Sequence, residues 1–224
     1  MFVLIPARGG SKGVARKNIR KLGDKPLIHY TIDSAREIFP DEKIIVSTDD
    51  IEIKKVVEQT GLKVPFLRPL HLATDTSSTR DVILHAISYL ENQGEDHELI
   101  VLLQPTSPFR TATHIEEALC LYSHDLDMVV GVKETKSNPY YVLYEEDQLG
   151  NLQKSKEGGF TRRQDCPKVW EFNGAIYIIN KGSILNSGFQ DFKKIKKYEM
   201  SEGDSVDIDT EFDWVFAEML LRGN

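Results

Sequence analysis

The sequence predicts one α/β domain built on a Rossmann-like, doubly wound and mainly parallel sheet. Short apolar segments of strand length alternate with amphipathic segments of helix length through residues 1–122, and four such strand–helix units in a row are typical of this class. The 224 residues, 40% hydrophobic and 28% charged, are enough for one domain with a sizeable core. A loop of glycines and basic residues directly after the first apolar segment is the third indication, because such folds bind ligands at strand ends.

The strands of the expected sheet are short and apolar. The segment at 98–103 is apolar on both faces, as a strand in the middle of a parallel sheet should be. Strands are therefore predicted at 2–5, 43–48 and 98–103, with a short extended piece at 63–66.

Helices are expected between these strands, because apolar residues recur there at helical spacing after residues that favour a helix start. The residues at these starts are Pro26, Asp49 and Asp50, Ser78 with Asp81, and Thr113 with Glu116. The last two pairs resemble capping boxes, in which two side chains each bond the other's backbone N–H.

The pattern changes from residue 128 onward. A further buried strand is expected at 128–132, whereas 133–168 is polar, rich in turn formers and lacks a convincing helix. Segments 140–144 and 175–179 are predicted as strands on either side of a charged excursion. We interpret residues 133–198, approximately, as an arm within the single domain and as a surface for self-association.

Composition narrows the class of protein. The net charge of −7, with basic residues confined to patches, argues against a nucleic-acid binder. Cys120 and Cys166 form no metal or redox spacing and are interpreted as reduced thiols. No apolar run approaches membrane-spanning length, and no secretory signal is apparent. We therefore expect a cytoplasmic protein with neither a nucleic acid nor a membrane as partner.

The basic loop, residues 8–18, is the first candidate site. Seven basic residues fall between Arg8 and Lys25, against the single acid Asp24. Small residues let backbone N–H groups surround an anion, and the basic side chains supply countercharge, so the loop predicts a polyphosphate site. Its spacing matches neither a Walker A loop nor a dinucleotide fingerprint. Arg8 and Lys17 are the strongest candidates for contacting the phosphates. The alternative is that the loop is flexible and solvated.

The turn Gln104–Arg110 is the second candidate. It follows the central strand directly, and its two prolines fix the polar side chains between them. The basic loop, Asp49 and Gln104 all follow strands, so a parallel sheet would bring them to one edge. The turn is therefore expected to bind a ligand, and the alternative is that it only redirects the chain.

A pair of carboxylates, Asp207 and Asp209, is the third candidate. In an extended chain every second side chain points to the same side, so the two carboxylates would face one way. Two carboxylates beside phosphates are suited to binding Mg²⁺. The alternative is that Asp209 caps the last helix and Asp207 is solvated. That helix carries apolar residues at helical spacing, which are Phe212, Val215, Phe216, Met219 and Leu220.

The fourth candidate combines Arg163, in the stretch Arg162–Asp165, with Asn173 and Tyr177 further on. An arginine fork recognises a carboxylate through two hydrogen bonds, and Asn and Tyr recognise hydroxyls or amides. A solvated charged turn before a strand is the alternative.

The motifs IPARGGSKGVARKNI, LQPTSPFRT, RRQ followed by NGAIY, and SVDIDTEFD together resemble the N-acylneuraminate cytidylyltransferase family, the CMP-sialic acid synthetases, which include CMP-legionaminate and CMP-pseudaminate synthetases. They span almost the whole chain in the family's order. The resemblance implies a homodimeric nucleotidyltransferase that uses CTP, Mg²⁺ and a nine-carbon α-keto acid sugar, and that releases pyrophosphate and a CMP-sugar. It leaves open whether the sugar is of the N-acetylneuraminate, legionaminate or pseudaminate type.

The resemblance also implies roles for individual residues. The nucleotide-binding residues would be Arg8, Gly10, Ser11, Lys17, Asn18, Arg68 and Ser78. The sugar-binding residues would be Gln104, Arg163, Asn173 and Tyr177. Asp207 and Asp209 would bind the metal, and Arg8, Lys17 and Asp209 would be catalytic. The arm would place residues of one subunit over the sugar site of the other.

Two other functions compete with this one. A CMP-Kdo synthetase usually has a loop closer to PARYGSTRLPGK, which the basic loop does not match well. A non-catalytic nucleotide-binding module would have no need of the Asp207–Asp209 pair. Pyrophosphate release from CTP with different acceptors separates these functions.

Overall fold

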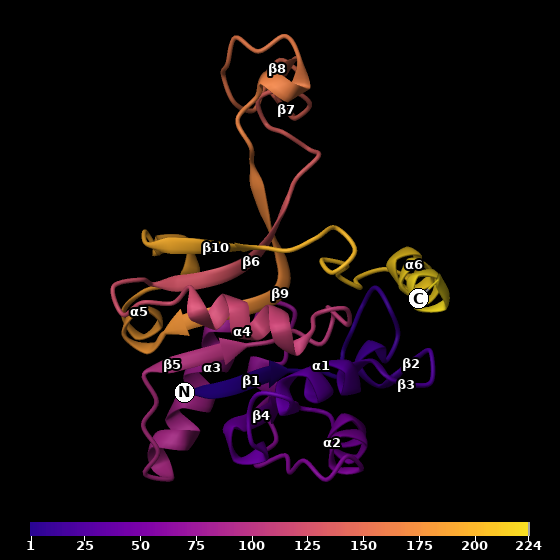
Figure 1. The fold of residues 1–224 in the computed structure, drawn as a ribbon, viewed down its shortest axis with the longest axis vertical. Helices are drawn as coiled ribbons and strands as arrows, with labels where there is room; N and C mark the ends of the chain where they lie inside the picture. Colours follow the sequence, from indigo (N-terminus) through magenta and orange to yellow (C-terminus); the bar gives the residue numbers. More distant parts are fainter. Residues whose placement is uncertain (224) are drawn as a thin grey trace.

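A six-stranded sheet with strand order β10-β6-β9-β5-β1-β4 forms the body of the computed structural model, which describes residues 1–223 (Figure 1). β1 is parallel to β4 and β5, β6 is parallel to β10, and β9 runs antiparallel to β5 and β6. The strands are β1 (Phe2–Pro6), β4 (Ile44–Ser47), β5 (Leu99–Leu102), β6 (Met128–Glu134), β9 (Trp170–Asn180) and β10 (Ile195–Glu199). The predicted mainly parallel α/β fold is confirmed.

Helices cover both faces of this sheet. Alternating side chains of the strands pack against α1, α2 and α4 on one face and against α3 and α5 on the other, giving two apolar cores. The helices are α1 (Leu27–Arg36), α2 (Ile51–Glu58), α3 (Thr79–Asn92), α4 (Ala112–Cys120), α5 (Lys181–Asn186) and α6 (Glu211–Gly223). Short 3-10 helices lie at Lys17–Ile19, Asp41–Lys43, Leu70–Leu72, Arg163–Asp165 and Phe189–Asp191. Within residues 1–223, no helix is both long enough and apolar enough to cross a bilayer.

The closing helix α6 packs beside the small hairpin of β2 (Lys21–Leu22) and β3 (Lys25–Pro26), as Figure 1 shows. Its buried side chains are Trp214 and Ala217, which join a third apolar core. The apolar residues that the sequence placed at helical spacing lie largely outside this contact: Phe212 is 80% exposed and Met219 is 64% exposed.

An arm projects from the body between β6 and β9 (Figure 1). It carries a hairpin of β7 (Tyr144–Glu146) and β8 (Leu152–Lys154). The arm is shorter than the predicted 133–198, because β9 and β10 belong to the main sheet.

Two local predictions are wrong. Residues 140–143 form turns and not a strand, because the buried side chain of Asn138 bends the chain by accepting from the Tyr140 N–H at 3.0 Å. The capping box of α4 uses Thr111 with His114 in place of Thr113 with Glu116. The predicted extended piece at 63–66 forms no named strand and is followed by an isolated parallel bridge between Leu67 and Thr48.

Candidate active site

A cleft of about 460 Å³ opens at the C-terminal ends of β1 and β5. Its walls come from the basic loop, from residues 68–82 and from the turn after β5, as expected for a ligand site in this kind of sheet. The predicted residues that line it are Arg8, Ser11, Lys17, Asn18, Arg68, Gln104 and Asp209. Gly10, Ser78, Arg163, Asn173, Tyr177 and Asp207 lie outside this lining.

Lys17 connects the basic loop to the carboxylate pair. Its side chain is buried in the first 3-10 helix, and its Nζ donates to the backbone oxygen of Ile208 at 2.6 Å and to Oδ1 of Asp209 at 2.8 Å. The ammonium group is therefore held in one place at the cleft wall, beside a carboxylate that is itself exposed.

Hydrogen bonds fix the shape of the basic loop. The buried amide of Asn18 donates to the backbone oxygen of Arg8 at 2.9 Å, and the N–H of Gly9 donates to Asp49 at 3.1 Å. At Gly13 the loop touches the segment that carries the carboxylate pair, since a Cβ there would lie 1.9 Å from the backbone oxygen of Asp209. Glycine is thus required at this contact, and the loop and the pair form one unit.

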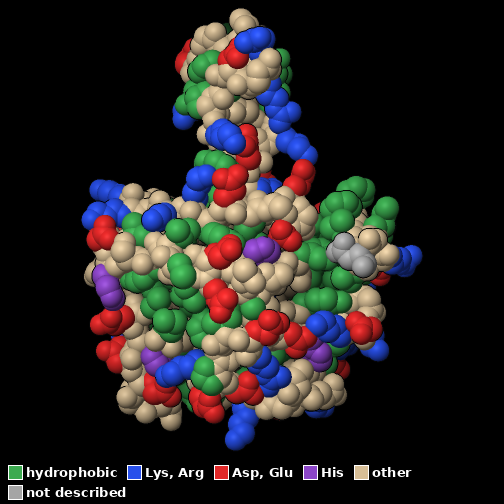
Figure 2. Space-filling view, in the orientation of Figure 1, with side chains coloured by type: hydrophobic (Ala, Val, Ile, Leu, Met, Phe, Trp, Pro, Cys, Tyr) green, Lys and Arg blue, Asp and Glu red, His purple; other side chains and the backbone are tan. Residues whose placement is uncertain are grey.

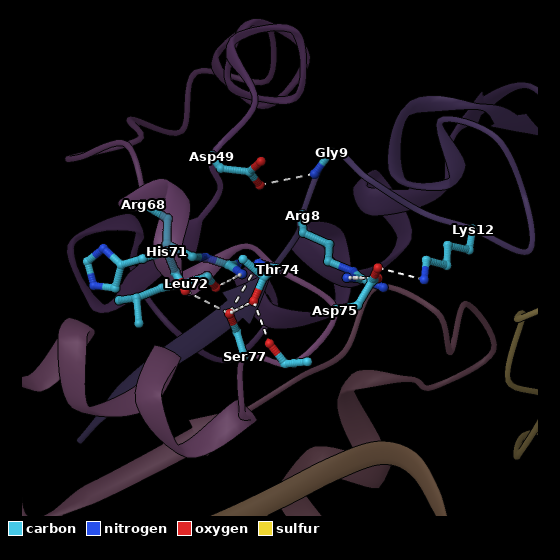
Figure 3. A network of polar contacts seen from close by, with 11 residues as sticks. Arg8, Gly9, Lys12, Asp49, Arg68, His71, Leu72, Thr74, Asp75 and Ser77 are labelled. Carbon is cyan, nitrogen blue, oxygen red and sulfur yellow. Dashed lines mark hydrogen bonds and ion pairs between the residues drawn. The ribbon is translucent and has the colours of Figure 1, made fainter.

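Asp75 lies opposite the basic loop and bonds two of its cations (Figure 3). Arg8 Nη1 donates to Asp75 Oδ1 at 2.7 Å, and Lys12 Nζ lies 2.6 Å from Oδ2. Hydrogen bonds from Lys12 and Arg8 lower the pKa of the Asp75 carboxyl. Sequence reasoning missed Asp75. The feature that could have indicated it is the stretch 73–79, which is polar and has no apolar periodicity.

Arg68 is a largely buried residue of the cleft lining (Figure 3). It is 5% exposed, and it donates through Nε to the Ser47 hydroxyl at 3.0 Å, through Nη2 to the Ser47 backbone oxygen and through Nη1 to the Leu72 oxygen at 3.4 Å. Burial lowers the pKa of Arg68, and the charge of Asp49 opposes this shift. The predicted contact of Arg68 with the nucleotide stays a prediction.

Ser78 occupies a helix cap and not the cleft lining. Its hydroxyl accepts from the Asp81 N–H at 3.1 Å, and the Asp81 carboxylate accepts in return from the Ser78 N–H at 3.4 Å, which completes the predicted capping box of α3. The neighbouring Ser77 lines the cleft instead. A nucleotide contact by Ser78 remains a prediction that competes with this cap.

Gln104 and Asp207 meet at Gly174. Gly174 has a left-handed φ of 76°, and a Cβ there would lie 3.2 Å from Oε1 of Gln104 and 3.3 Å from Oδ2 of Asp207. Burial, and then the charge of Asp207, raise the pKa of Tyr177 to about 12, so its hydroxyl stays protonated near neutral pH. We call Gln104, Gly174, Tyr177 and Asp207 the Gly174 cluster.

Asn173 and Arg163 lie elsewhere. Asn173 is 3% exposed, and its amide donates to Ser205 at 2.9 Å and accepts from the Ala175 N–H at 3.1 Å, so its polar atoms are occupied inside the protein. Arg163 is exposed and lies in the arm, outside the cleft of its own chain. Their sugar contacts stay predictions.

The carboxylate pair has the chemistry of a magnesium site. Oδ1 of Asp207 is buried without a hydrogen-bond partner in the described chain, whereas Asp209 faces the cleft. Burial raises the pKa of Asp207, and the nearby Thr106 hydroxyl opposes this shift. Residues 1–223 contain no cluster of three or more candidate metal ligands, so a cation here would complete its shell with water and substrate oxygens. Mg²⁺ prefers that arrangement, and these residues fit it.

A Rossmann-like sheet whose strand ends carry a basic loop next to a carboxylate pair is the arrangement expected of the nucleotidyltransferase class. Comparison with known proteins makes the assignment specific, because residues 2–205 match the family model described as cytidylyltransferase. The chain belongs to the cytidylyltransferase family, and the resemblance drawn from its motifs is confirmed.

Named relatives match nearly the whole chain. Post-translational flagellin modification protein B of Campylobacter coli is 34% identical over 97% of this chain and 93% of its own length. CMP-N,N'-diacetyllegionaminic acid synthase of Legionella pneumophila is 35% identical over 100% of this chain and 97% of its own. The N-acylneuraminate cytidylyltransferase of Streptococcus agalactiae serotype V is 36% identical over 95% of this chain but 51% of its own, so the chain spans about half of that relative.

A solved structure supports the fold independently. CMP:2-keto-3-deoxy-manno-octonic acid synthetase complexed with CTP superposes with a TM-score of 0.72 over 99% of this chain and 98% of the other. The sequences are 17% identical, so this similarity bears on the fold alone.

Proposed function

We propose that the protein transfers the CMP unit of CTP to a nine-carbon α-keto acid sugar of the sialic, legionaminic or pseudaminic type and releases pyrophosphate. The observation that carries the proposal is a single cleft that is lined both by the basic loop with Lys17 and by Gln104 of the Gly174 cluster. The names of relatives that match nearly the whole chain support this substrate class.

The basic loop acts on the triphosphate. Arg8 and Lys12 leave Asp75 and neutralise phosphate oxygens, while Lys17 stabilises the charge that develops on the α-phosphate and on the leaving pyrophosphate. Gln104 orients the sugar so that its anomeric hydroxyl attacks in line. Removal of the Lys17 ammonium should lower turnover by roughly 10²–10³-fold, the effect of losing one well-placed charge donor.

Asp207 and Asp209 would hold Mg²⁺, which neutralises phosphate oxygens and lowers the pKa of a nearby hydroxyl. Lys17 contributes by fixing the Asp209 carboxylate through its bond at 2.8 Å. The contact of Gly13 with Asp209 keeps the pair at a constant position relative to the phosphates.

The active form is proposed to be a cytoplasmic homodimer in which the arm of one subunit brings Arg163 to the sugar carboxylate in the cleft of the other. The position of Arg163 in the projecting arm supports this, since it lies outside its own cleft. Apolar side chains exposed on the arm also favour a subunit contact, and these are Val142, Leu143, Leu149 and Leu152.

Pyrophosphate release from CTP and Mg²⁺ tests the proposal, with N-acetylneuraminate, N,N'-diacetyllegionaminate, pseudaminate and Kdo as acceptors and Asp209→Asn as the inactive control. Release with a nine-carbon acid, and formation of the matching CMP-sugar, is the expected result. Release with Kdo alone would make the protein a CMP-Kdo synthetase. CTP binding without release for any acceptor would point to a non-catalytic module.

A further inference from the structure

Arg110 is a buried arginine without a carboxylate partner. It is 2% exposed, and within residues 1–223 its Nε and Nη2 have no hydrogen-bond partner. Burial lowers the pKa of Arg110 to about 9, and the group therefore stays charged at neutral pH. A buried unpaired charge costs stability that an apolar residue of similar size would not. The guanidinium must therefore do something that an apolar residue cannot.

The hydrogen bonds of Arg110 indicate the role of its guanidinium. Its Nη1 donates to the backbone oxygen of Gln104 at 3.1 Å and to that of Ala175 at 3.0 Å. Gln104 follows β5, whereas Ala175 lies in β9, so one nitrogen bridges the two strand segments beside the cleft.

The Ala175 carbonyl needs this partner because β9 is irregular here. The register of β9 with β6 shifts between Val130 and Val132, and the pairing with β5 ends at Tyr177. The backbone of Ala175 therefore lies outside both ladders, and side chains satisfy it: Asn173 accepts from its N–H and Arg110 donates to its oxygen.

This irregular stretch includes Gly174, against which Oε1 of Gln104 and Oδ2 of Asp207 both lie. Arg110 thus fixes the backbone of Gln104 and also the backbone of the segment that Gln104 contacts. It does not line the cleft itself, so any effect on a ligand is transmitted through Gln104.

We propose that Arg110 is a positioning residue for the sugar half of the site: by bridging the carbonyls of Gln104 and Ala175 it holds the Gln104 amide in the orientation that the acceptor requires. The inference rests on the proposed function, since it takes Gln104 as the acceptor contact. A displacement of about 1 Å at a substrate-positioning group can cost roughly 10²-fold in rate.

A double-mutant cycle tests this inference. Arg110→Gln should lower kcat/KM for the sugar acid roughly 10–100-fold and leave KM for CTP within about twofold, because Arg110 bonds the backbone of Gln104 and Ala175 and no residue of the basic loop. Arg110→Lys, which keeps a cationic donor, should recover part of the loss. In a Gln104→Ala background, Arg110→Gln should add less than about threefold.

Arg36→Gln is the matched control, because Arg36 pairs with Asp41 on the surface, away from the cleft. Equal losses for CTP and the sugar, a loss that multiplies in the Gln104→Ala background, or unchanged kinetics in Arg110→Gln would each overturn the inference. Thermal melts check folding, and if Arg110→Gln does not fold, Arg110→Lys carries the same cycle. Failure of the proposed function would give a result distinct from all of these, because the unmutated protein would then release no pyrophosphate with any nine-carbon acceptor.

Discussion

Asp75 bonds Arg8 and Lys12 of the basic loop, and in the proposed function CTP displaces it from both side chains. Asp75→Asn removes this competing charge, so CTP should bind roughly threefold to tenfold more tightly. Isothermal titration with CTP at fixed Mg²⁺ measures the gain, which should shrink with added salt because the groups are exposed.

Asp41→Asn is the control for this experiment, since Asp41 pairs with Arg36 on the surface away from the cleft. A different role for Asp75 would show as weaker CTP binding in Asp75→Asn. If that weakening occurred with Mg²⁺ and not without it, Asp75 would assist the cation and would not compete with the nucleotide.

Gly13 is the point where the basic loop meets the carboxylate pair. In Gly13→Ala the new Cβ would meet the Asp209 backbone oxygen at 1.9 Å, so the loop must move away from Asp209. We expect kcat/KM for CTP to fall about 10²-fold, measured by pyrophosphate release. Gly203→Ala is the control, because its nearest neighbouring atom is 3.8 Å away. Similar activity in the two variants would show that the contact is dispensable.

The site residues that could be predicted from the sequence are those that belong to a recognisable motif. Lys17 and Asp209 belong to two motifs far apart in the chain, and the structure joins them by a hydrogen bond. Asp75 was missed because one acid in a Ser- and Thr-rich stretch is ordinary in composition. The inward direction of Asn173 was not predictable, since it depends on the irregular pairing of β9.

At the scale of elements, the cap of α3 distinguishes two roles for Ser78. If its hydroxyl serves the capping box, Ser78→Ala should lose about 1 kcal/mol of stability and leave KM for CTP within about twofold. Thermal unfolding and steady-state kinetics measure both quantities. Ser78→Thr, which retains a capping hydroxyl, should restore stability. A rise in KM with an unchanged melting temperature would instead support the nucleotide contact that the motifs imply.

The presence of a helix was predictable from the spacing of its apolar residues. The residue at which a helix begins depended on tertiary contacts. α4 begins after Thr111 because the preceding Arg110 is drawn into the protein by bonds to Gln104 and Ala175. Nothing in the local sequence favours Thr111 over Thr113, since each has a possible partner three residues later. The start of a helix next to a buried side chain is therefore a property of the packed molecule.

At the scale of the whole molecule, the helical periodicity of α6 correctly indicated an apolar face but not its partner. Hydrophobic side chains gather in the region of α6 in Figure 2. The exposed apolar residues of α6 are Phe212, Val215, Phe216 and Met219. α6 begins at Glu211, two residues after Asp209, which lines the cleft. Exposed patches of this kind mark interaction surfaces, and the proposed subunit contact would cover apolar area on the arm as well.

Complementation between two defective variants tests whether the arm acts on the neighbouring subunit. Lys17→Ala disables the cleft of its own chain, whereas Arg163→Ala removes the side chain proposed to serve the partner's cleft. Each variant alone should be nearly inactive. After unfolding and refolding together in equal amounts, half of the dimers would be mixed, each with one intact site, so pyrophosphate release should return to about a quarter of the unmutated level. The same variants mixed without refolding are the control. If Arg163 served its own cleft, no mixed dimer would contain an intact site, and activity would not return.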